Sequence, residues 1–199
     1  MKPPERVAAL ASLDRPHSVE GATQPDDELA LGARTDSAAF EALYLRHRTA
    51  VYRYLAARTI DGDDAADLTA LTFERAFVAL GSYRTGEAGF RAWLLRIARN
   101  AAIDHGRRRR AVPVLEPRAS FTEGPEAQLE ADEAALELRR RVAALQADQR
   151  DAIVLRFAGG LSAREIGVAM GKSEAASQKL VSRGLAALKE VYGVRSTGR

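Results

Sequence analysis

The chain has 199 residues with 46% hydrophobic and only 6% aromatic side chains, a composition that allows modest cores and excludes one large sheet. Its 30 basic and 27 acidic residues leave a formal charge of +3, so net charge says little about partners. The absence of cysteine excludes disulfides, thiolate zinc sites and a thiol nucleophile. No apolar run approaches the roughly 20 residues that span a bilayer, so we expect a cytoplasmic protein without direct membrane insertion.

The N-terminal part of the chain changes character at residue 26. Residues 1–25 contain prolines, scattered acids and no sustained hydrophobic period, which predicts a mobile N-terminal extension. A helical period then begins, and Asp36 or Ser37 is a suitable N-cap for the first long helix. After a break at Asp61-Gly62, a second helix is expected from about Asp63 to the glycines that start at Gly81. The apolar positions of these two helices are Phe40, Leu43, Tyr44, His47, Val51 and Leu55, and Leu68, Leu71, Phe73, Ala76, Phe77 and Leu80.

The segment Phe90–Arg110, FRAWLLRIARNAAIDHGRRRR, joins an amphipathic helix to an unbroken run of arginines. Its predicted core stripe leaves Arg96 and Arg99 pointing away from the core. Closely spaced guanidinium groups create a positive potential that suits a phosphate backbone, although such runs are also common at solvated helix ends. The stripe itself consists of Phe90, Trp93, Leu94, Ile97, Ala98 and Ala101.

Residues 112–128 separate this region from a second helical one. They hold three prolines, a glycine and more acidic than basic side chains, which predicts a flexible acidic linker. Helical patterning resumes over residues 129–192, and residues 193–199 are expected to form a disordered tail. No segment alternates as a strand does. The predicted fold class is therefore all-α, with two small helical domains joined by the linker.

The C-terminal region carries a helix-turn-helix pattern between Leu161 and Leu188. Ser162 can cap the first helix, Gly171 allows a sharp turn, and Ser173 can cap the second helix. The second helix would turn amide, hydroxyl and cationic side chains outward, where they could address base edges and phosphates in a major groove. Small helical hairpins with a glycine turn also occur in proteins that bind no DNA, so the motif alone leaves both interpretations open. The predicted inner positions are Leu161, Ile166, Ala169 and Met170, followed by Ala176, Leu180, Gly184, Ala187 and Leu188.

Together these motifs resemble the extracytoplasmic-function (ECF) class of bacterial sigma factors, the smallest members of the sigma-70 type. DAADLTALTFERAF resembles the family's segment that binds core polymerase, and FRAWLLRIARNAAIDHGRRRR resembles its promoter-melting and minus-ten segment. LQADQRDAIVLRFAGGLSAREIGVAMGKSEAASQKLVSRGLAALK is similar to the family's helix-turn-helix domain for the minus-thirty-five element. The resemblance implies that residues 26–111 form sigma region 2 and residues 129–192 form sigma region 4. It implies a sigma factor that is not an enzyme, needs no cofactor, and has core RNA polymerase and promoter DNA as partners.

The resemblance also implies roles for single residues. The polymerase clamp helices would be bound by Asp64, Asp67, Leu68, Phe73 and Arg75. A base flipped from the non-template strand would be held by Ser82, Tyr83 and Arg84. The opened minus-ten element would be contacted by Arg96, Arg99, Asn100 and Asp104, and its phosphates by Arg107, Arg108, Arg109 and Arg110. The minus-thirty-five element would be read by Ser173, Ala175, Gln178, Lys179, Ser182 and Arg183.

Three positions depart from the family pattern. Ala70 and Leu71 stand where an acidic residue is usual before Thr-Phe, which implies weaker or differently packed polymerase binding. Ser177 replaces a buried valine of the recognition helix, and its hydroxyl is expected to bond to a carbonyl one turn earlier. The family resemblance further implies an inhibitory anti-sigma factor that packs between or around the two DNA-binding domains.

Catalytic and metal-binding patterns fit poorly. Asp61, Asp63 and Asp64 look like the start of a calcium loop, but Ala66 and Thr72 occupy the positions that need glycine and a bidentate acid. The three histidines share no metal-ligand spacing, and we expect His17, His47 and His105 on solvated faces. We therefore expect neither a metal nor a small-molecule substrate.

Two other functions remain as alternatives. One is a free-standing helix-turn-helix transcriptional regulator with an N-terminal protein-interaction domain. Such a regulator needs no melting helix and usually dimerises to read paired half-sites, and no dimer helix is visible. The other is an RNA-binding protein, which would normally expose more aromatic side chains than this composition provides.

Overall fold

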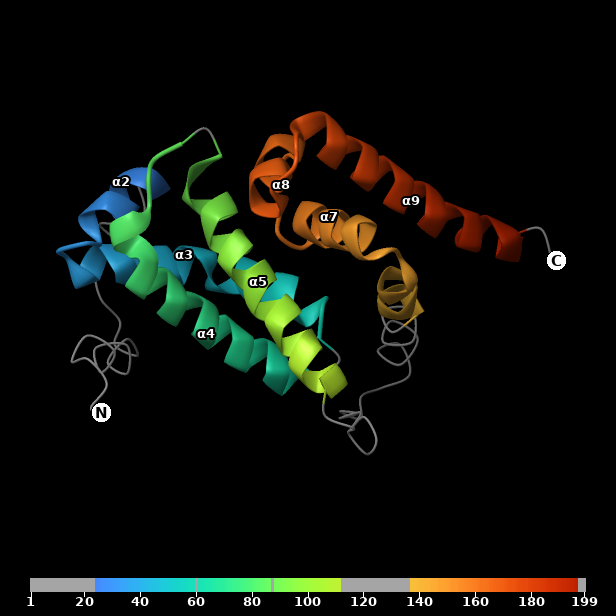
Figure 1. Cartoon of the computed structure of the whole chain (residues 1–199), viewed down its shortest axis with the longest axis horizontal. Coiled ribbons are helices and arrows are strands. Elements are labelled where there is room, and N and C mark those ends of the chain that lie inside the picture. The colour runs from blue at the N-terminus through green and yellow to red at the C-terminus, as the bar shows by residue number, and fades with distance from the viewer. Residues whose placement is uncertain (1–23, 60, 87, 112–136, 197–199) are drawn as a thin grey trace.

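The computed structural model describes residues 24–59, 61–86, 88–111 and 137–196 (Figure 1). Within these ranges the chain forms helices and turns without a strand, which confirms the all-α prediction. The N-terminal domain contains α2 (Asp26–Gly32), α3 (Ser37–Ala56), α4 (Gly62–Ala79), the 3-10 turn η3 (Leu80–Ser82) and α5 (Gly89–Ala111). The C-terminal domain contains a helical segment over residues 137–144, then α7 (Ala147–Phe157), α8 (Ala163–Met170) and α9 (Glu174–Ser196).

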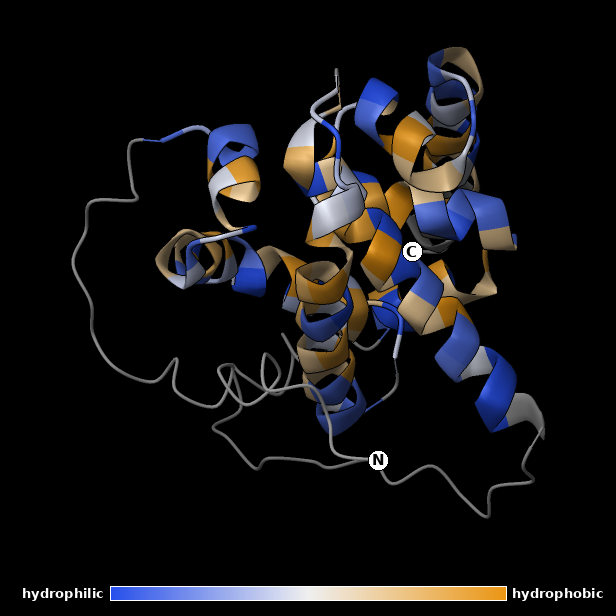
Figure 2. Ribbon diagram, turned by 60° about the vertical axis from the view of Figure 1, so that its left-hand side comes forward, coloured by the Kyte–Doolittle hydropathy of each residue, from blue (hydrophilic) through white to orange (hydrophobic). Residues whose placement is uncertain are grey.

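The N-terminal domain is organised around aromatic side chains of α3 and α4. The ring of Phe40 meets those of Phe73 and Phe77 edge to face at centroid distances of 6.4 and 4.9 Å, and Tyr44 meets Phe73 at 4.8 Å. Both helices begin at the acids that the sequence indicated as boundaries. The Asp36 side chain accepts a hydrogen bond from the Ala38 N–H, and the Asp61 side chain caps α4 in the same way. Figure 2 shows hydrophobic residues gathered where the helices face one another.

The helix-turn-helix in the C-terminal domain forms as the sequence predicts. Ser162 accepts from the Glu165 N–H at 3.3 Å, and the Glu165 carboxylate accepts from the Ser162 N–H at 2.7 Å, which completes a capping box. Gly171 ends α8 in the left-handed region at φ 68°. The Ser173 hydroxyl accepts from the Ala176 N–H and so caps α9. Ser177 is fully buried, and its hydroxyl donates to the Ser173 carbonyl 3.0 Å away, as expected from the sequence.

The tail boundary predicted from the sequence is wrong. Helix α9 continues to Ser196, four residues into the stretch expected to be disordered. This stretch contains no proline, and a single glycine in a helix costs only about 1 kcal/mol relative to alanine. Residues 1–23, 112–136 and 197–199 lie outside the described residues, so the mobile extension and the acidic linker stay predictions.

Helix α5 belongs to the N-terminal domain and also contacts the C-terminal domain, so it is the element that positions the candidate site. One side packs against α3 and α4, and the other packs against α8 (Figure 1). Helix α9 extends away from the N-terminal domain toward the C-terminus, so its outer face lies apart from α5. Among the described helices, none is long and apolar enough to cross a membrane.

Candidate nucleic-acid interface

Helix α5 presents its first face to the core of the N-terminal domain. Phe90, Leu94, Ala98 and Ala101 are buried there, while Trp93 and Ile97 are half-buried at its edge. Phe90, Trp93 and Tyr83 form an aromatic cluster with centroid distances between 5.1 and 5.6 Å. This face follows the predicted hydrophobic stripe, and it fixes which side chains of α5 point elsewhere.

A second face of α5 packs against the C-terminal domain through Arg91, Leu95 and Arg99, each one helical turn from the next. A Cβ atom placed on Gly159 would lie 3.0 Å from Leu95 Cδ1, and one placed on Gly160 would lie 2.6 Å from Arg91 Nη2. Gly160 also has φ +67°, so its backbone conformation favours glycine there. The Gly159-Gly160 pair therefore lets α5 approach the backbone between α7 and α8.

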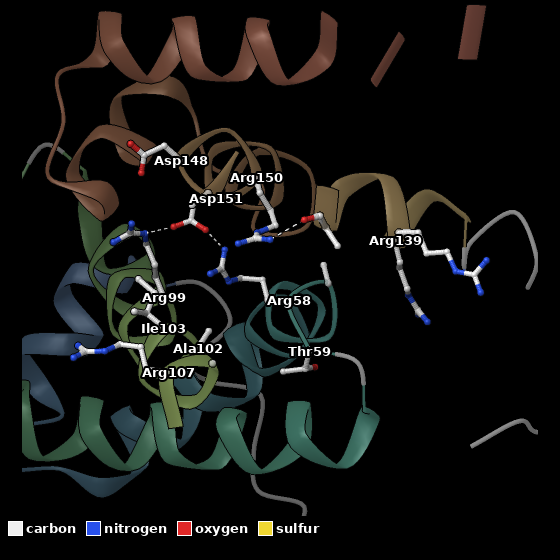
Figure 3. A pocket seen from close by; sticks show the side chains of 15 residues that line it. Arg58, Thr59, Arg99, Ala102, Ile103, Arg107, Arg139, Asp148, Arg150 and Asp151 are labelled. Atoms are coloured by element: carbon white, nitrogen blue, oxygen red, sulfur yellow. Dashed lines mark hydrogen bonds and ion pairs between the residues drawn. The ribbon is translucent and has the colours of Figure 1, made fainter. Parts of the chain in front are cut away.

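Asp151 of α7 connects this second face to the turn that follows α3 (Figure 3). One carboxylate oxygen accepts from Arg99 Nε at 2.6 Å, and the other accepts from Arg58 Nη1. Asp151 is 3% exposed, so the charged group is satisfied by two guanidinium groups of the other domain rather than by water. Arg58 is itself positioned over the buried Tyr54 ring, with its guanidinium carbon 5.9 Å from the ring centroid.

The third face of α5 is open to solvent. Arg96 and Asn100 are exposed, and Arg107 is exposed further along the same side of the helix. Arg108 and Arg109 are exposed as well, whereas the side chain of Arg110 lies outside the described residues. Of the four residues expected to contact an opened minus-ten strand, Arg96 and Asn100 are thus free to do so, while Arg99 is engaged by Asp151.

An open cavity of about 730 Å³ lies beside the Asp151 contact, between the two domains (Figure 3). Six arginines contribute to its wall and only two carboxylates, Asp148 and Asp151. Asp148 is also bound to Lys172, 3.0 Å away. The cavity therefore has a strong positive potential of the kind that attracts phosphate groups. The arginines are Arg58, Arg99, Arg107, Arg139, Arg140 and Arg150.

A smaller groove of about 180 Å³ runs between α4 and α5. On α4 it is lined by residues that share one face of the helix: Asp64, Asp67, Leu71 and Arg75 along its edge and the buried Leu68 at its base. Arg75 Nη1 lies 3.5 Å from Asp104 Oδ2, and Asp64 forms an ion pair with Arg109. The residues expected to bind polymerase and those expected to bind promoter DNA are therefore linked across this groove.

Two residues expected to contact polymerase are not on the surface. Leu68 is 4% exposed and Phe73 is 2% exposed, because both lie on the side of α4 that packs against α3 and α5. Their role is to position the helix. The accessible polymerase candidates are therefore Asp64, Asp67 and Arg75, with Leu71 between them.

The structure also corrects the expectation for Tyr83. This residue is 2% exposed, and its hydroxyl donates to Asp27 Oδ1 at 2.5 Å. Burial and the bond to Asp27 raise the pKa of Tyr83 well above its usual range. The same Asp27 oxygen accepts from the Phe90 N–H at 2.9 Å, so Asp27 joins the loop to the start of α5. A flipped base would therefore be left to the exposed neighbours Ser82 and Arg84.

His47 is buried, contrary to the expectation of a solvated position. It is 5% exposed, and its Nε2 atom lies 2.7 Å from Asp26 Oδ2. Its place on the core stripe of α3 was the signal that favoured burial. His105 has a partly exposed side chain 3.4 Å from Asp64, and His17 lies outside the described residues. Over the described part of the chain, no cluster of three acids or histidines could hold a metal ion.

The outer face of α9 agrees with the sequence prediction. All six residues expected to read DNA are exposed, and they occupy the first three turns of the helix and its cap. The α8–α9 turn brings the helix N-terminus to the surface, as a recognition helix requires. The residues are Ser173, Ala175, Gln178, Lys179, Ser182 and Arg183.

Two family models match the chain: Sigma-70 region 2 over residues 43–112 and Sigma-70, region 4 over residues 135–188. Among curated proteins, RNA polymerase sigma factor CarQ of Myxococcus xanthus is 36% identical, over 78% of this chain and 90% of CarQ. ECF RNA polymerase sigma factor BldN of Streptomyces coelicolor is 33% identical over 75% of this chain, and the match spans 59% of BldN.

Solved structures are similar as well. CnrH in complex with the cytosolic domain of CnrY aligns with a TM-score of 0.67 and 28% identity, over 85% of this chain and 97% of CnrH. RpoE from Bartonella quintana, solved with the anti-sigma factor NepR, aligns with a TM-score of 0.59 and 23% identity, over 80% of this chain and 98% of RpoE. The second likeness is one of fold alone.

Proposed function

Because the chain belongs to the extracytoplasmic-function class of sigma-70 RNA polymerase sigma factors, we propose that it binds core RNA polymerase and opens promoters that have two recognition elements. The main support is the presence of two separate polar faces on one chain. One is the solvent face of α5 with Arg96 and Asn100, and the other is the outer face of α9 with Lys179 and Arg183. A sigma factor needs both to read an opened strand and an upstream duplex.

The division of work between the two faces follows from the energetics of opening DNA. Separating base pairs costs about 1.4 kcal/mol per step on average. Stacking and polar contacts to an extruded base supply about 1 to 3 kcal/mol each, so a few contacts on α5 and its preceding loop offset a short opened region. The upstream contacts of α9 leave the duplex closed and act as an anchor.

The groove between α4 and α5 supports the proposed polymerase surface. Its α4 wall offers two carboxylates, Asp64 and Asp67, which lie two turns and one turn before a partly exposed Leu71. Asp64 already pairs with Arg109 and Arg75 with Asp104, so polymerase binding here would release DNA-contacting side chains from their internal partners. Core binding and strand binding would then favour one another.

A regulatory partner is proposed as well. CnrH, which is 28% identical, has been solved in complex with the cytosolic domain of CnrY. This precedent supports binding of a second protein to the present chain, and we propose that this partner is an anti-sigma factor. The alternative of a free-standing regulator is disfavoured, since both sigma region models match the chain.

The polymerase surface is tested by titrating sigma-free core polymerase into fluorescently labelled protein. Asp67→Lys is expected to weaken binding about tenfold, since an exposed charge reversed within an interface typically costs on the order of 1 to 2 kcal/mol. Glu28→Lys, an equally exposed acid on α2, is the matched control and should bind as the unmodified chain does. Equal affinities for the Asp67 variant and the control would refute the assignment of this surface.

A further inference from the structure

We propose that the C-terminal domain of the free chain closes over α5 and that Asp151 is the latch, holding Arg99 away from an opened DNA strand. The inference rests on the proposed role of Arg99 in strand binding. It makes the second face of α5 a shared surface, used by α7 and α8 in the free protein and by DNA in the initiating complex.

The geometry sets the two uses of Arg99 in competition. Its Nε atom donates to Asp151 at 2.6 Å, and its side chain is only 18% exposed. A phosphate or base that binds through Nε has to displace the Asp151 carboxylate, and the low exposure of the side chain limits access to the rest of the guanidinium. Arg96 and Asn100 stay exposed in the closed form, so a strand could meet α5 there and still lack the contact to Arg99.

Charge explains why a single carboxylate controls the closure. Burial lowers the pKa of the Arg58 guanidinium, and the positive charges of Arg150 and Arg99 lower it further. These three arginines therefore repel one another where the domains meet, and Asp151 is the buried carboxylate that offsets the repulsion. Without this carboxylate, the closed form would bring uncompensated guanidinium groups together. The open form would leave each of them in water.

Apolar and backbone contacts complete the closed surface without depending on charge. Leu95 is 1% exposed although it lies off the core stripe, and it meets the chain at Gly159. Arg91 lies against Gly160 one turn earlier. The positively charged cavity adjoins the latch, so a polyanion that enters it reaches Arg99 and competes directly with Asp151.

Domain opening can be measured by electron spin resonance, because the cysteine-free chain accepts two unique labels. Val78→Cys on α4 and Ala186→Cys on α9 place spin labels at exposed positions in the two domains. We expect one narrow distance distribution for the otherwise unmodified chain and a longer, broader one for Asp151→Asn. Asp148→Asn removes the same charge from the same helix and cavity without touching α5, and it should keep the narrow distribution.

A variant in the other domain keeps this test independent of folding in the C-terminal domain. Arg58→Gln removes one partner of Asp151 and should also broaden the distribution, although Arg99 retains part of the contact. The proposal is overturned if the distance distribution stays unchanged in every one of these two variants, Asp151→Asn and Arg58→Gln, that folds.

Strand binding provides the second readout. The probe is a fluorescent 20-nucleotide single strand of random sequence, titrated with the full-length chain. Asp151→Asn should bind about threefold to tenfold more tightly, the range for one regained charge-assisted contact. Adding Arg99→Ala should remove this gain, and a gain that survives would show that Arg99 is not the group released.

Transcription distinguishes failure of the latch from failure of the proposed function. If the chain directs core polymerase to promoters but Asp151→Asn neither opens nor binds the strand more tightly, the latch is wrong and the function stands. If the variant opens as expected but neither form supports initiation, the contact is real and the function is wrong.

Discussion

At the residue scale, the least expected feature is the pair of acids at the start of α2. Asp26 lies beside the buried His47, and Asp27 accepts hydrogen bonds from both the Tyr83 hydroxyl and the Phe90 N–H in the first turn of α5. These contacts join residues 21 to 63 positions apart, so no local pattern indicated them. They hold the start of the loop before α5 in place, although the residues that follow in this loop are exposed.

The first prediction concerns stability against pH. Burial lowers the pKa of His47 below its usual 6.5, and this effect outweighs the opposing influence of Asp26. The unfolded chain therefore takes up the proton first, so stability is full above about pH 6.5 and falls as the pH drops below it. The expected loss is at most about 1.4 kcal/mol per pH unit.

Urea unfolding at pH 7.5, 6.5 and 5.5 measures this dependence. His47→Gln should flatten the slope between these values, because the titrating group is gone. His105→Gln, at a partly exposed position, serves as the control and should keep the slope. An unchanged slope in the His47 variant would mean that another group titrates.

Sequence reasoning succeeded at the residue scale where local chemistry decides the outcome. Asp36, Ser162 and Ser173 cap helices because a side-chain oxygen two or three residues before a free N–H has few better partners. It failed for Tyr83. The position of Tyr83 in a loop suggested that its side chain is exposed to DNA, but a hydrogen bond to the distant Asp27 carboxylate holds it in the core. The predicted polymerase contacts of Leu68 and Phe73 were wrong for another reason. A family motif contains both residues that contact a partner and residues that pack the helix into the core.

At the element scale, α5 has three faces where the sequence indicated two. Its core stripe was predictable from the helical period, and so was the direction of Arg96 and Arg99 away from the core of the N-terminal domain. The second face, which packs against the C-terminal domain, was visible in the sequence as one irregularity, because Leu95 is a large apolar residue away from the stripe. Helical periodicity could not reveal what covers it, since Gly159 lies more than sixty residues further along the chain.

The turn of the helix-turn-helix leads to a second prediction. Gly171 has φ 68° and open space around its missing side chain, so Gly171→Ala is expected to lose about 1–2 kcal/mol through backbone conformation alone. Gly106 lies inside α5 with equally open space and without a positive φ, and Gly106→Ala should gain up to about 1 kcal/mol. Urea unfolding of both variants gives the two values. Shifts of the same sign would contradict this explanation of the turn.

A third prediction concerns the recognition helix. Lys179→Ala and Arg183→Ala remove exposed cations from the outer face of α9 and should each weaken binding of the polymerase complex to an upstream element, by about threefold to tenfold. Lys189→Ala changes a similar exposed cation about 15 Å from Lys179 along the helix and should have little effect. Footprints of the complex on duplex promoter DNA measure the affinities. If all three variants protect the upstream element equally, α9 does not read it through these side chains.

At the scale of the whole molecule, the two domains were predictable and their closure was not. A proline-rich, acidic stretch between two helical patterns is sufficient to indicate two units. Their packing depends on Asp151, an acid that reads as one more solvated position of an amphipathic helix. Its burial depends on Arg58 and Arg99, which lie 93 and 52 residues earlier in the chain. No local sequence pattern indicates that these two arginines pair with Asp151.

The closed arrangement treats the two DNA-reading faces differently. The outer face of α9 is exposed, whereas the second face of α5 is covered by the C-terminal domain. In this form of the free protein, the proposed upstream-binding face of α9 stays accessible, while the proposed contact of Arg99 with an opened strand is blocked. Core polymerase, by separating the domains along the promoter, would restore that contact where it is needed.

The most direct measurement is run-off transcription on fragmented bacterial genomic DNA, with purified protein added to sigma-free core polymerase and the 5′ ends of the new RNA sequenced. The account predicts defined start sites that share a two-part upstream sequence and vanish when the protein is omitted. Scattered starts, or none although the protein binds DNA by itself, would contradict it and would favour a regulator that acts without the polymerase surface of α4.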